Sequence, residues 1–294
     1  MLPFSFKKMA VLGGVLYAGA LPVSFLVGGY VYSRPFRTGL NIQEIISAVR
    51  PEWDRKFLSL MREVEIDLRP RVEIRGTVFG ANSHSTVIVL HSRGENRLEG
   101  IEAAYALWDV GFDVLLLDRY AHGLSDGDQR PLFGGEEDEI SAVISAMVKH
   151  QWSGTSTIGV FGIGDAGTSA LVAAARDPRI DAASGENPAV TATDMIRASL
   201  ATWAPLPDLL LIPHAYLSTQ GMRMASDATL EDLDASDALS EIGVPSQILS
   251  IGTARSRDAR RVFDLLRTGV GSFESGPDRT TTYAAMVRFF EQSL

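Results

Sequence analysis

The sequence predicts an α/β fold with a doubly wound, mostly parallel sheet, an inserted cap and one N-terminal transmembrane helix. Apolar runs alternate with helical stretches from residue 63 onward, which is typical of parallel strands joined by right-handed helical crossovers. A stretch with several prolines, at about 188–236, interrupts the alternation and is the expected cap. An uncharged apolar segment precedes the domain. These observations divide the chain into a basic tail (1–8), a transmembrane anchor (9–32), a helical stalk (33–62) and an α/β domain (63–294).

The anchor, Met9–Tyr32, contains 24 residues and no charged side chain. At about 1.5 Å of rise per residue, such a helix crosses a hydrocarbon core of about 30 Å. Lys7 and Lys8 also fit the basic region of a cleaved signal peptide, with Ala18-Gly19-Ala20 as its cleavage site. Cleavage there would leave an apolar N-terminal stub, so we favour an uncleaved single-pass anchor. The basic residues in front of it favour a body on the non-cytoplasmic side.

Composition and charge exclude several classes of partner. The 294 residues carry a formal net charge of −9, and beyond residue 40 there are 23 basic against 36 acidic side chains. Because nucleic-acid affinity comes largely from basic side chains, we expect no nucleic-acid partner. The absence of cysteine excludes disulfides and thiolate metal sites. No histidine pair has metal-ligand spacing, so we expect no metal and no cofactor.

The elements of the α/β domain follow in order after a stalk helix (41–62) that is broken before Pro51. VEIDLR (64–69) and VEIRGTVF (72–79) predict a hairpin around Pro70. Further strands are predicted at 86–91, 113–118, 157–162, 179–184, 246–252 and 270–275, and helices at 99–110, 137–150, 166–176, 257–267 and 280–293. The acidic run 136–139 begins a helix, where carboxylates favour the positive end of the helix dipole.

One strand-to-helix turn is typical of a nucleophile elbow, which presents a catalytic side chain at its apex. The strand TIGVFG runs into Gly162–Gly167 (GIGDAG) and then into a helix. The crowded backbone needs small residues two positions before and two positions after the apex. Gly162 and Ala166 meet this requirement when Gly164 is the apex. Gly167 is a further small residue at the start of the helix.

Three further segments accompany the elbow. They are VIVLHSRGENR (87–97), DVLLLDRYAHGLSDG (113–127) and IGVPSQILSIGTA (242–254). With the elbow, and in this order and spacing, they resemble the α/β-hydrolase superfamily, in particular its serine-hydrolase and aminopeptidase-like group. The resemblance covers roughly residues 63–294. It implies an α/β-hydrolase fold, with His91, Ser92 and Arg93 forming a segment like the oxyanion loop.

The resemblance also implies positions for a Ser–His–acid triad, and this chain has other residues at all three. Gly164 at the apex has no hydroxyl with which to attack a carbonyl. The acid position after the seventh strand is Arg255, and a cation there cannot hold an imidazolium. The base position after the eighth strand is Pro277, while the last histidine of the chain is His214. We therefore expect no catalytic residues.

Asp165 is the other candidate nucleophile, but it would place Ile163 two positions before the apex, where bulk is disfavoured. Just past the apex, its carboxylate would oppose a developing oxyanion. We expect Asp165 and Arg93 to form an ion pair that fills the space of the oxyanion, since either charge alone is unfavourable near a buried cleft. Asp258 is expected to open a helix, and His214 is the histidine that could overhang a pocket from the cap.

Three functions follow from these observations. The favoured one is a membrane-anchored, non-catalytic protein of this fold that contacts the lipid bilayer through residues 9–32. Its cleft and cap would bind a small ligand or a protein partner, because fold alone does not dictate function. The alternative is a hydrolase of ester, amide or acyl substrates with a non-standard catalytic constellation. The third is a role in membrane assembly, which predicts a filled cleft and an exposed apolar patch.

Overall fold

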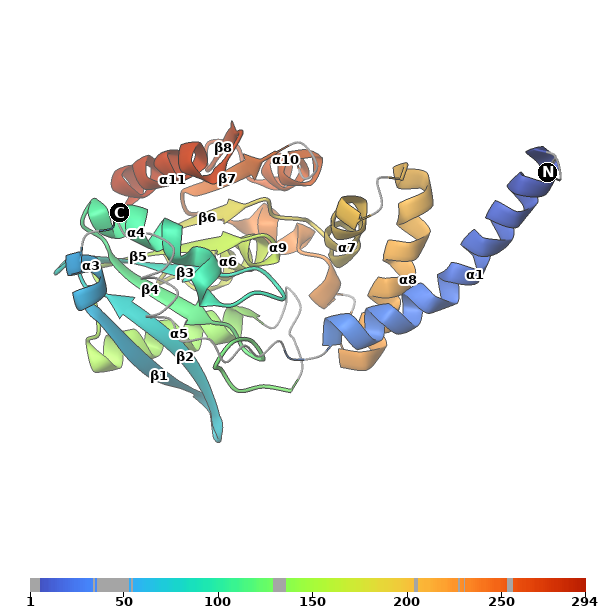
Figure 1. Cartoon of the computed structure of the whole chain (residues 1–294). Helices are drawn as coiled ribbons and strands as arrows, with labels where there is room; N and C mark the ends of the chain where they lie inside the picture. Colours follow the sequence, from blue (N-terminus) through green and yellow to red (C-terminus); the bar gives the residue numbers. More distant parts are fainter. Residues whose placement is uncertain are drawn as a thin grey trace.

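The computed structural model describes residues 6–33, 35, 53, 55–128, 136–203, 206–226, 228–229, 231–252 and 256–294. Its centre is a sheet of eight strands in the order β1-β2-β4-β3-β5-β6-β7-β8 (Figure 1). The strands are β1 (Met61–Arg69), β2 (Val72–Phe79), β3 (Ser85–Leu90), β4 (Asp113–Asp118), β5 (Thr157–Ile163), β6 (Ala182–Glu186), β7 (Ser246–Ile251) and β8 (Gly271–Gly276).

The sheet is mostly parallel, as predicted. β1 and β2 form the expected antiparallel hairpin, and β2 is also antiparallel to β4. Every neighbouring pair from β4 to β8 is parallel. Parallel neighbours need long crossovers, and helices supply them. The predicted strand at 179–184 begins three residues later, at Ala182.

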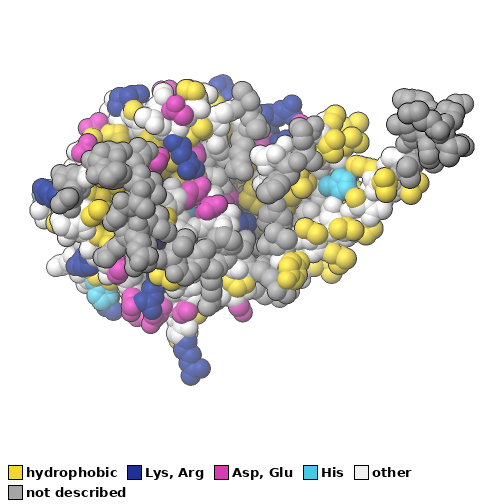
Figure 2. Space-filling model, viewed as in Figure 1, with side chains coloured by type: hydrophobic (Ala, Val, Ile, Leu, Met, Phe, Trp, Pro, Cys, Tyr) yellow, Lys and Arg dark blue, Asp and Glu magenta, His cyan; other side chains and the backbone are white. Residues whose placement is uncertain are grey.

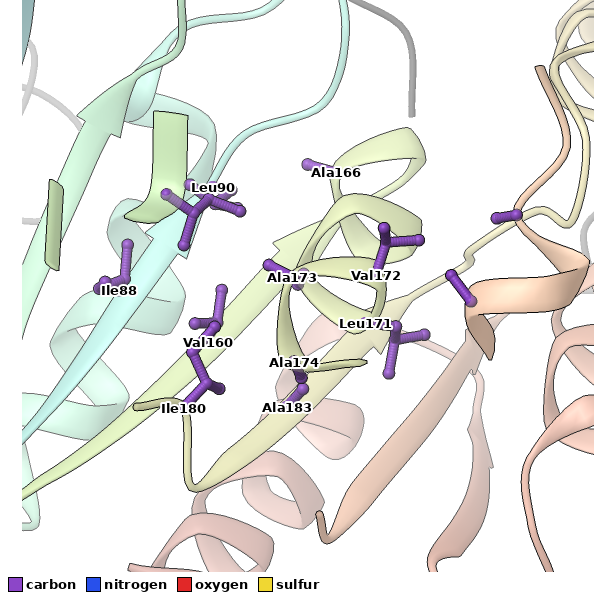
Figure 3. Close-up of a cluster of buried hydrophobic side chains, with 14 of the residues drawn as sticks. Ile88, Leu90, Val160, Ala166, Leu171, Val172, Ala173, Ala174, Ile180 and Ala183 are labelled. Atoms are coloured by element: carbon purple, nitrogen blue, oxygen red, sulfur yellow. The ribbon is translucent and has the colours of Figure 1, made fainter. Parts of the chain in front are cut away.

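Helices cover both faces of the sheet. They are α4 (Ile101–Asp109), which follows the short helix η1 (Arg97–Gly100), α5 (Glu136–His150), α6 (Asp165–Arg176), α9 (Ser236–Glu241), α10 (Ser256–Leu265) and α11 (Arg279–Ser293). One buried apolar cluster joins a face of the sheet to α5, α6 and α10, and a second joins the opposite face to α4 and α11. Figure 3 shows the first cluster, in which alanines such as Ala173 let α6 lie close to Ile88 and Val160 on the strands.

The predicted helical stalk is wrong at its C-terminal end. β1 begins at Met61, two residues inside the predicted stalk, and the helix before it, α3, has only five residues (Arg55–Ser59). Phe57 is fully buried and stacks on Phe79, with ring centroids 4.1 Å apart. Trp53 is buried as well and stacks on Tyr105. This segment therefore packs as part of the body; most of the predicted stalk (36–52) lies outside the described residues.

The N-terminal segment forms one long helix, α1 (Phe6–Ser33), which includes Lys7 and Lys8 of the predicted tail. Its window Gly13–Tyr30 is, within the described part of the chain, the one helical stretch long and apolar enough to cross a membrane. A signal sequence near the N-terminus can also be long and apolar enough to meet this criterion. Between β6 and β7, the predicted cap region contributes α7 (Ala192–Trp203) and α8 (Asp208–Ser226). α1 packs against α8, away from the sheet (Figure 1).

Candidate functional site

The turn between β5 and α6 has the geometry of an elbow. Gly164 forms its apex with φ +62° and ψ −123°, a left-handed backbone that favours glycine. A Cβ on Gly162 would collide with the backbone of Ala166, and one on Gly167 would lie 3.1 Å from the Cα of Gly185. The small residues of the motif therefore let the chain reverse sharply from strand to helix. At the apex itself, no side chain projects.

Asp165, the next residue, is buried. It contacts Arg93, which follows β3, and Arg119, which follows β4. Its Oδ1 accepts the backbone N–H of Arg93 at 2.6 Å, and its Oδ2 accepts Nη1 of Arg119 at 3.0 Å. Nε of Arg93 lies 3.7 Å from Oδ2, so the predicted ion pair is present. The shorter ionic contact is with Arg119, which the sequence interpretation did not include.

The surroundings keep Asp165 ionised. Burial alone would raise the pKa of its carboxyl, but the cations of Arg119 and Arg93, with their hydrogen bonds, hold this pKa well below its usual range. All the side chains of this cluster are at least 95% buried. The elbow thus carries a permanent buried carboxylate whose charge is compensated within the chain.

Arg119 is held in place by His91. Nη1 of Arg119 donates to the His91 carbonyl at 2.9 Å, and the Arg119 backbone N–H lies 3.1 Å from Nε2 of His91. Nε2 is therefore an acceptor, which places the proton on Nδ1, 2.8 Å from the Ser92 carbonyl. The nearby ring of His122 is neutral, because burial, with adjacent His91 and Arg119, lowers its pKa to about 2.

A second, partly buried network includes Ser92 of the segment that resembles the oxyanion loop. The backbone N–H and the hydroxyl of Ser92 both donate to Glu99 at 2.7 Å. Arg279 bridges Glu99, at 3.0 Å, and Glu186, at 3.2 Å. The hydroxyl of Tyr283 donates to Glu186 at 2.9 Å. Burial nevertheless raises the pKa of Glu186 against the opposing charge of Arg279. The sequence interpretation missed this network, which joins residues up to 180 positions apart.

The resemblance implies an acid at position 255 and a histidine at position 277, but the chain has Arg255 and Pro277 there. Arg255 lies outside the described residues. Pro277 follows β8 directly, and the next residue, Asp278, caps α11 by accepting the backbone N–H of Thr281 at 2.9 Å. Asp258 lies in the first turn of α10, as predicted, and accepts two hydrogen bonds from Arg197, at 2.6 and 2.8 Å.

His214 is not among the residues that line the pocket beside the elbow, and it contacts the N-terminal helix. It points from α8 toward α1, where its Nδ1 lies 2.6 Å from the hydroxyl of Ser24. The ring of Tyr17 packs edge-on against the imidazole at 4.8 Å between centroids. Because Ser24 belongs to the apolar N-terminal helix, this contact joins two helices and lies away from the elbow.

A small pocket remains beside the elbow. It is lined by Asp165, Asn187, Pro188, Ala189, Met195, Ala198 and Asp258. The cap helix α7 supplies Met195 and Ala198, while the two carboxylates are already engaged by arginines. Across the described ranges, no three His, Asp or Glu side chains are grouped so that they could hold a metal ion. The pocket thus offers an apolar wall and carboxylates bound to cations.

Comparison with known proteins gives a likeness in structure only. No protein-family model and no curated protein matches the chain. An esterase of Pyrococcus furiosus, Pf2001, superposes with a TM-score of 0.66 at 17% identity, over 82% of this chain and 95% of its own.

Two further solved structures give the same result. The α/β hydrolase GrgF from Penicillium sp. sh18 gives a TM-score of 0.62 at 16% identity, over 79% of this chain and 98% of its own. A hypothetical protein of Pseudomonas aeruginosa, PA2218, gives a TM-score of 0.63 at 16% identity, over 83% of this chain and 98% of its own. With the strand order, the parallel sheet and the elbow described above, these likenesses show that the chain has the α/β-hydrolase fold.

Proposed function

We propose that this chain is a membrane-anchored protein whose α/β-hydrolase-fold body binds a small ligand or a protein partner without hydrolysing it. The observation that carries the proposal is the position of the Asp165 carboxylate. It accepts the backbone N–H of Arg93, in the segment that resembles the oxyanion loop. An N–H group that already binds a carboxylate is not offered to a substrate oxyanion.

The chemistry of acyl transfer supports this reading. Such a reaction needs a nucleophile, a base to activate it, and donors aimed at the developing negative charge. The apex residue, Gly164, has no side chain. A fixed negative charge on Asp165, next to the apex, would raise the energy of an oxyanion formed there. Asp258, the nearest acid to the expected acid position, is bound to Arg197.

The alternative is hydrolysis of an ester, amide or acyl substrate by a non-standard constellation. The sharp turn at Gly164 favours it, because the elbow backbone is retained, and one structural neighbour is called an esterase. The two functions differ in a measurable way, since a hydrolase must turn over substrate and a binding body need not.

The test is an activity-probe assay on the full-length protein in detergent. The unmodified protein, Gly164→Ser and Gly164→Ala are each incubated with a fluorophosphonate probe and with simple aryl esters. We expect no labelling and no turnover in any of them, because a hydroxyl at the apex still lacks a base. Gly164→Ala is the matched control, since it adds the same Cβ without the hydroxyl. Labelling or turnover by the unmodified protein would overturn the proposal.

The membrane anchor is tested separately. We expect the protein to stay in the membrane fraction after alkaline carbonate extraction, and its intact mass to include the N-terminal helix. Loss of residues 1–20 would instead identify a signal peptide. Because the chain contains no cysteine, a single cysteine at exposed Lys149 reports orientation. A membrane-impermeant maleimide should label it from the non-cytoplasmic side.

A further inference from the structure

The exposed side chains of α8 are apolar. They are Leu209, Leu210, Ile212, Tyr216, Met224 and Ala225, and none is polar or charged apart from the tyrosine hydroxyl. Leu209 is 81% exposed and Met224 69%. A water-facing helix normally turns its polar side chains outward and its apolar stripe inward. The cap helix does the opposite.

The exposed face of α1 has the same character and lies beside it. Its exposed large side chains are Val15, Leu16, Val23, Leu26, Val27 and Tyr30. Figure 2 shows hydrophobic side chains gathered along both helices, on the arm that extends from the body. Together they form one continuous apolar surface, which we call the α1–α8 face.

The two helices touch over the part of α1 that is apolar enough to span a membrane. The hydroxyl of Tyr17 donates to the Leu210 carbonyl at 3.0 Å, and Ser218 donates to the Ser24 carbonyl at 2.9 Å. Further along, a Cβ on Gly28 would collide with the backbone of Ser218. These α1 residues all lie within Gly13–Tyr30. Any lipid that surrounds this length of α1 must therefore meet α8 as well.

Three polar side chains of α8 are engaged within the protein, and the half-buried Arg223 lies in its last turn. Ser218 and His214 point into the contact with α1, where small and hydroxyl-bearing residues let membrane helices pack closely. Asp208, at the first residue of the helix, is paired with Arg197 and Arg257. The backbone is helical from Asp208 to Ser226, so most of its N–H and C=O groups are paired within the helix, although Pro213 has no N–H to donate to the Leu209 carbonyl.

We propose that the α1–α8 face contacts the lipid bilayer as a unit, with α8 entering the apolar layer beside α1 and seating the cap on the membrane. The proposal rests on the membrane anchor proposed above. It makes α8 a second membrane-binding element, whose exposed apolar side chains meet the acyl chains beside α1. The pocket beside Asp165, which α7 lines, is then held close to the bilayer surface.

The test uses single cysteines in the full-length protein, which has none of its own. Leu209→Cys and Ile212→Cys report on α8, Leu26→Cys on α1, and Lys149→Cys on the far, water-exposed surface of α5. Each variant is labelled with the fluorophore NBD and reconstituted into phosphatidylcholine vesicles. Quenching by iodide measures contact with water, and quenching by a doxyl-labelled phospholipid measures contact with lipid.

We expect the labels at 209 and 212 to behave like the label at 26. They should be quenched by the doxyl lipid and show an iodide quenching constant several-fold lower than the label at 149. Iodide quenching at 209 and 212 equal to that at 149, with lipid quenching retained at 26, would overturn the proposal for α8 and leave the anchor intact. If the labels at 209 and 212 were protected from both iodide and the doxyl lipid, the lipid contact of α8 would be overturned in favour of contact with a protein partner. Water exposure at 26 would overturn the anchor itself.

Discussion

The carboxylate of Asp165 and the backbone N–H of Arg93 are joined by a hydrogen bond of 2.6 Å. This bond ties the start of α6 to the loop after β3, the segment that resembles an oxyanion loop. Hydrogen bonds to a charged acceptor are stronger than neutral ones. The link therefore holds the loop in place.

Replacing Asp165 by Asn should destabilise the protein by about 3 to 5 kcal/mol, because it removes the carboxylate that compensates the buried cations of Arg119 and Arg93. Urea unfolding followed by tryptophan fluorescence measures the change. Asp264→Asn is the matched control, since its pair with Arg260 is more than half exposed and should contribute at most about 1 kcal/mol. Equal effects of the two variants would contradict the assigned role of the buried cluster.

Glu139 should make stability fall as pH rises. Burial raises the pKa of its carboxyl from 4.5 to about 7, against the opposing charge of Arg119. The folded protein thus holds this proton more tightly than the unfolded chain does. Its contribution is lost between about pH 4.5 and 7, with a cost of about 3 kcal/mol above that range.

The measurement is the urea midpoint of the unmodified protein and of Glu139→Gln at pH 5 and pH 8. The glutamine can still accept the backbone N–H of Tyr120, as Glu139 does at 2.8 Å, but it cannot ionise. We expect its stability to decline less between the two pH values. Asp138→Asn, an exposed neighbour in the same helix, should retain the full decline. An unchanged decline in Glu139→Gln would refute the prediction.

Phe57→Ala should destabilise the body by about 3 to 5 kcal/mol, because it empties a fully buried site that is stacked on Phe79. Lys56→Ala, at an exposed position of the same short helix, should change stability by no more than about 0.5 kcal/mol. Chemical unfolding compares the two. A small effect of Phe57→Ala would mean that the segment before β1 is dispensable, as a free stalk would be.

Gly28→Val should separate or strain the contact between α1 and α8, since even a Cβ at this position meets the backbone of Ser218. Overpacking of this kind costs about 1 to 3 kcal/mol. We expect a lower melting temperature and faster proteolysis of the cap. Gly19→Val lies on the same helix with nothing within 4 Å of its Cβ, and it should leave both measurements unchanged. Matching results for the two variants would exclude a tight helix contact.

Much of the sheet was predictable because its signals are local. The apolar run 86–90 forms β3, and the hairpin around Pro70 follows from two short strands with a turn between them. The elbow was predictable because its small residues, Gly162 and Gly164, are required by a backbone that no bulky residue tolerates. The boundary before β1 was not predictable, because the burial of Phe57 depends on its packing against aromatic side chains, such as Phe79, that come later in the chain.

The site was predicted in part for the same reason. Asp165 and Arg93 follow neighbouring parallel strands, so their meeting could be inferred from topology. Arg119 follows the next strand in the sheet, β4, and the same argument applied to that strand would have found it. The partners of Arg279 and His214 had no such local signal, because they are brought together by tertiary packing across 180 and 190 positions.

The glycine contact between α1 and α8 restricts how this molecule can move. Gly221 brings its backbone against Phe25, just as Gly28 does against Ser218, so an outward swing of α8 on its own would have to break this close packing with α1. Without that break, the recess beside Asp165 would widen through a shift of α7 or through a rocking of the whole two-helix arm against the sheet. In the second case, a tilt of the N-terminal helix would move the cap helices and change the width of the recess.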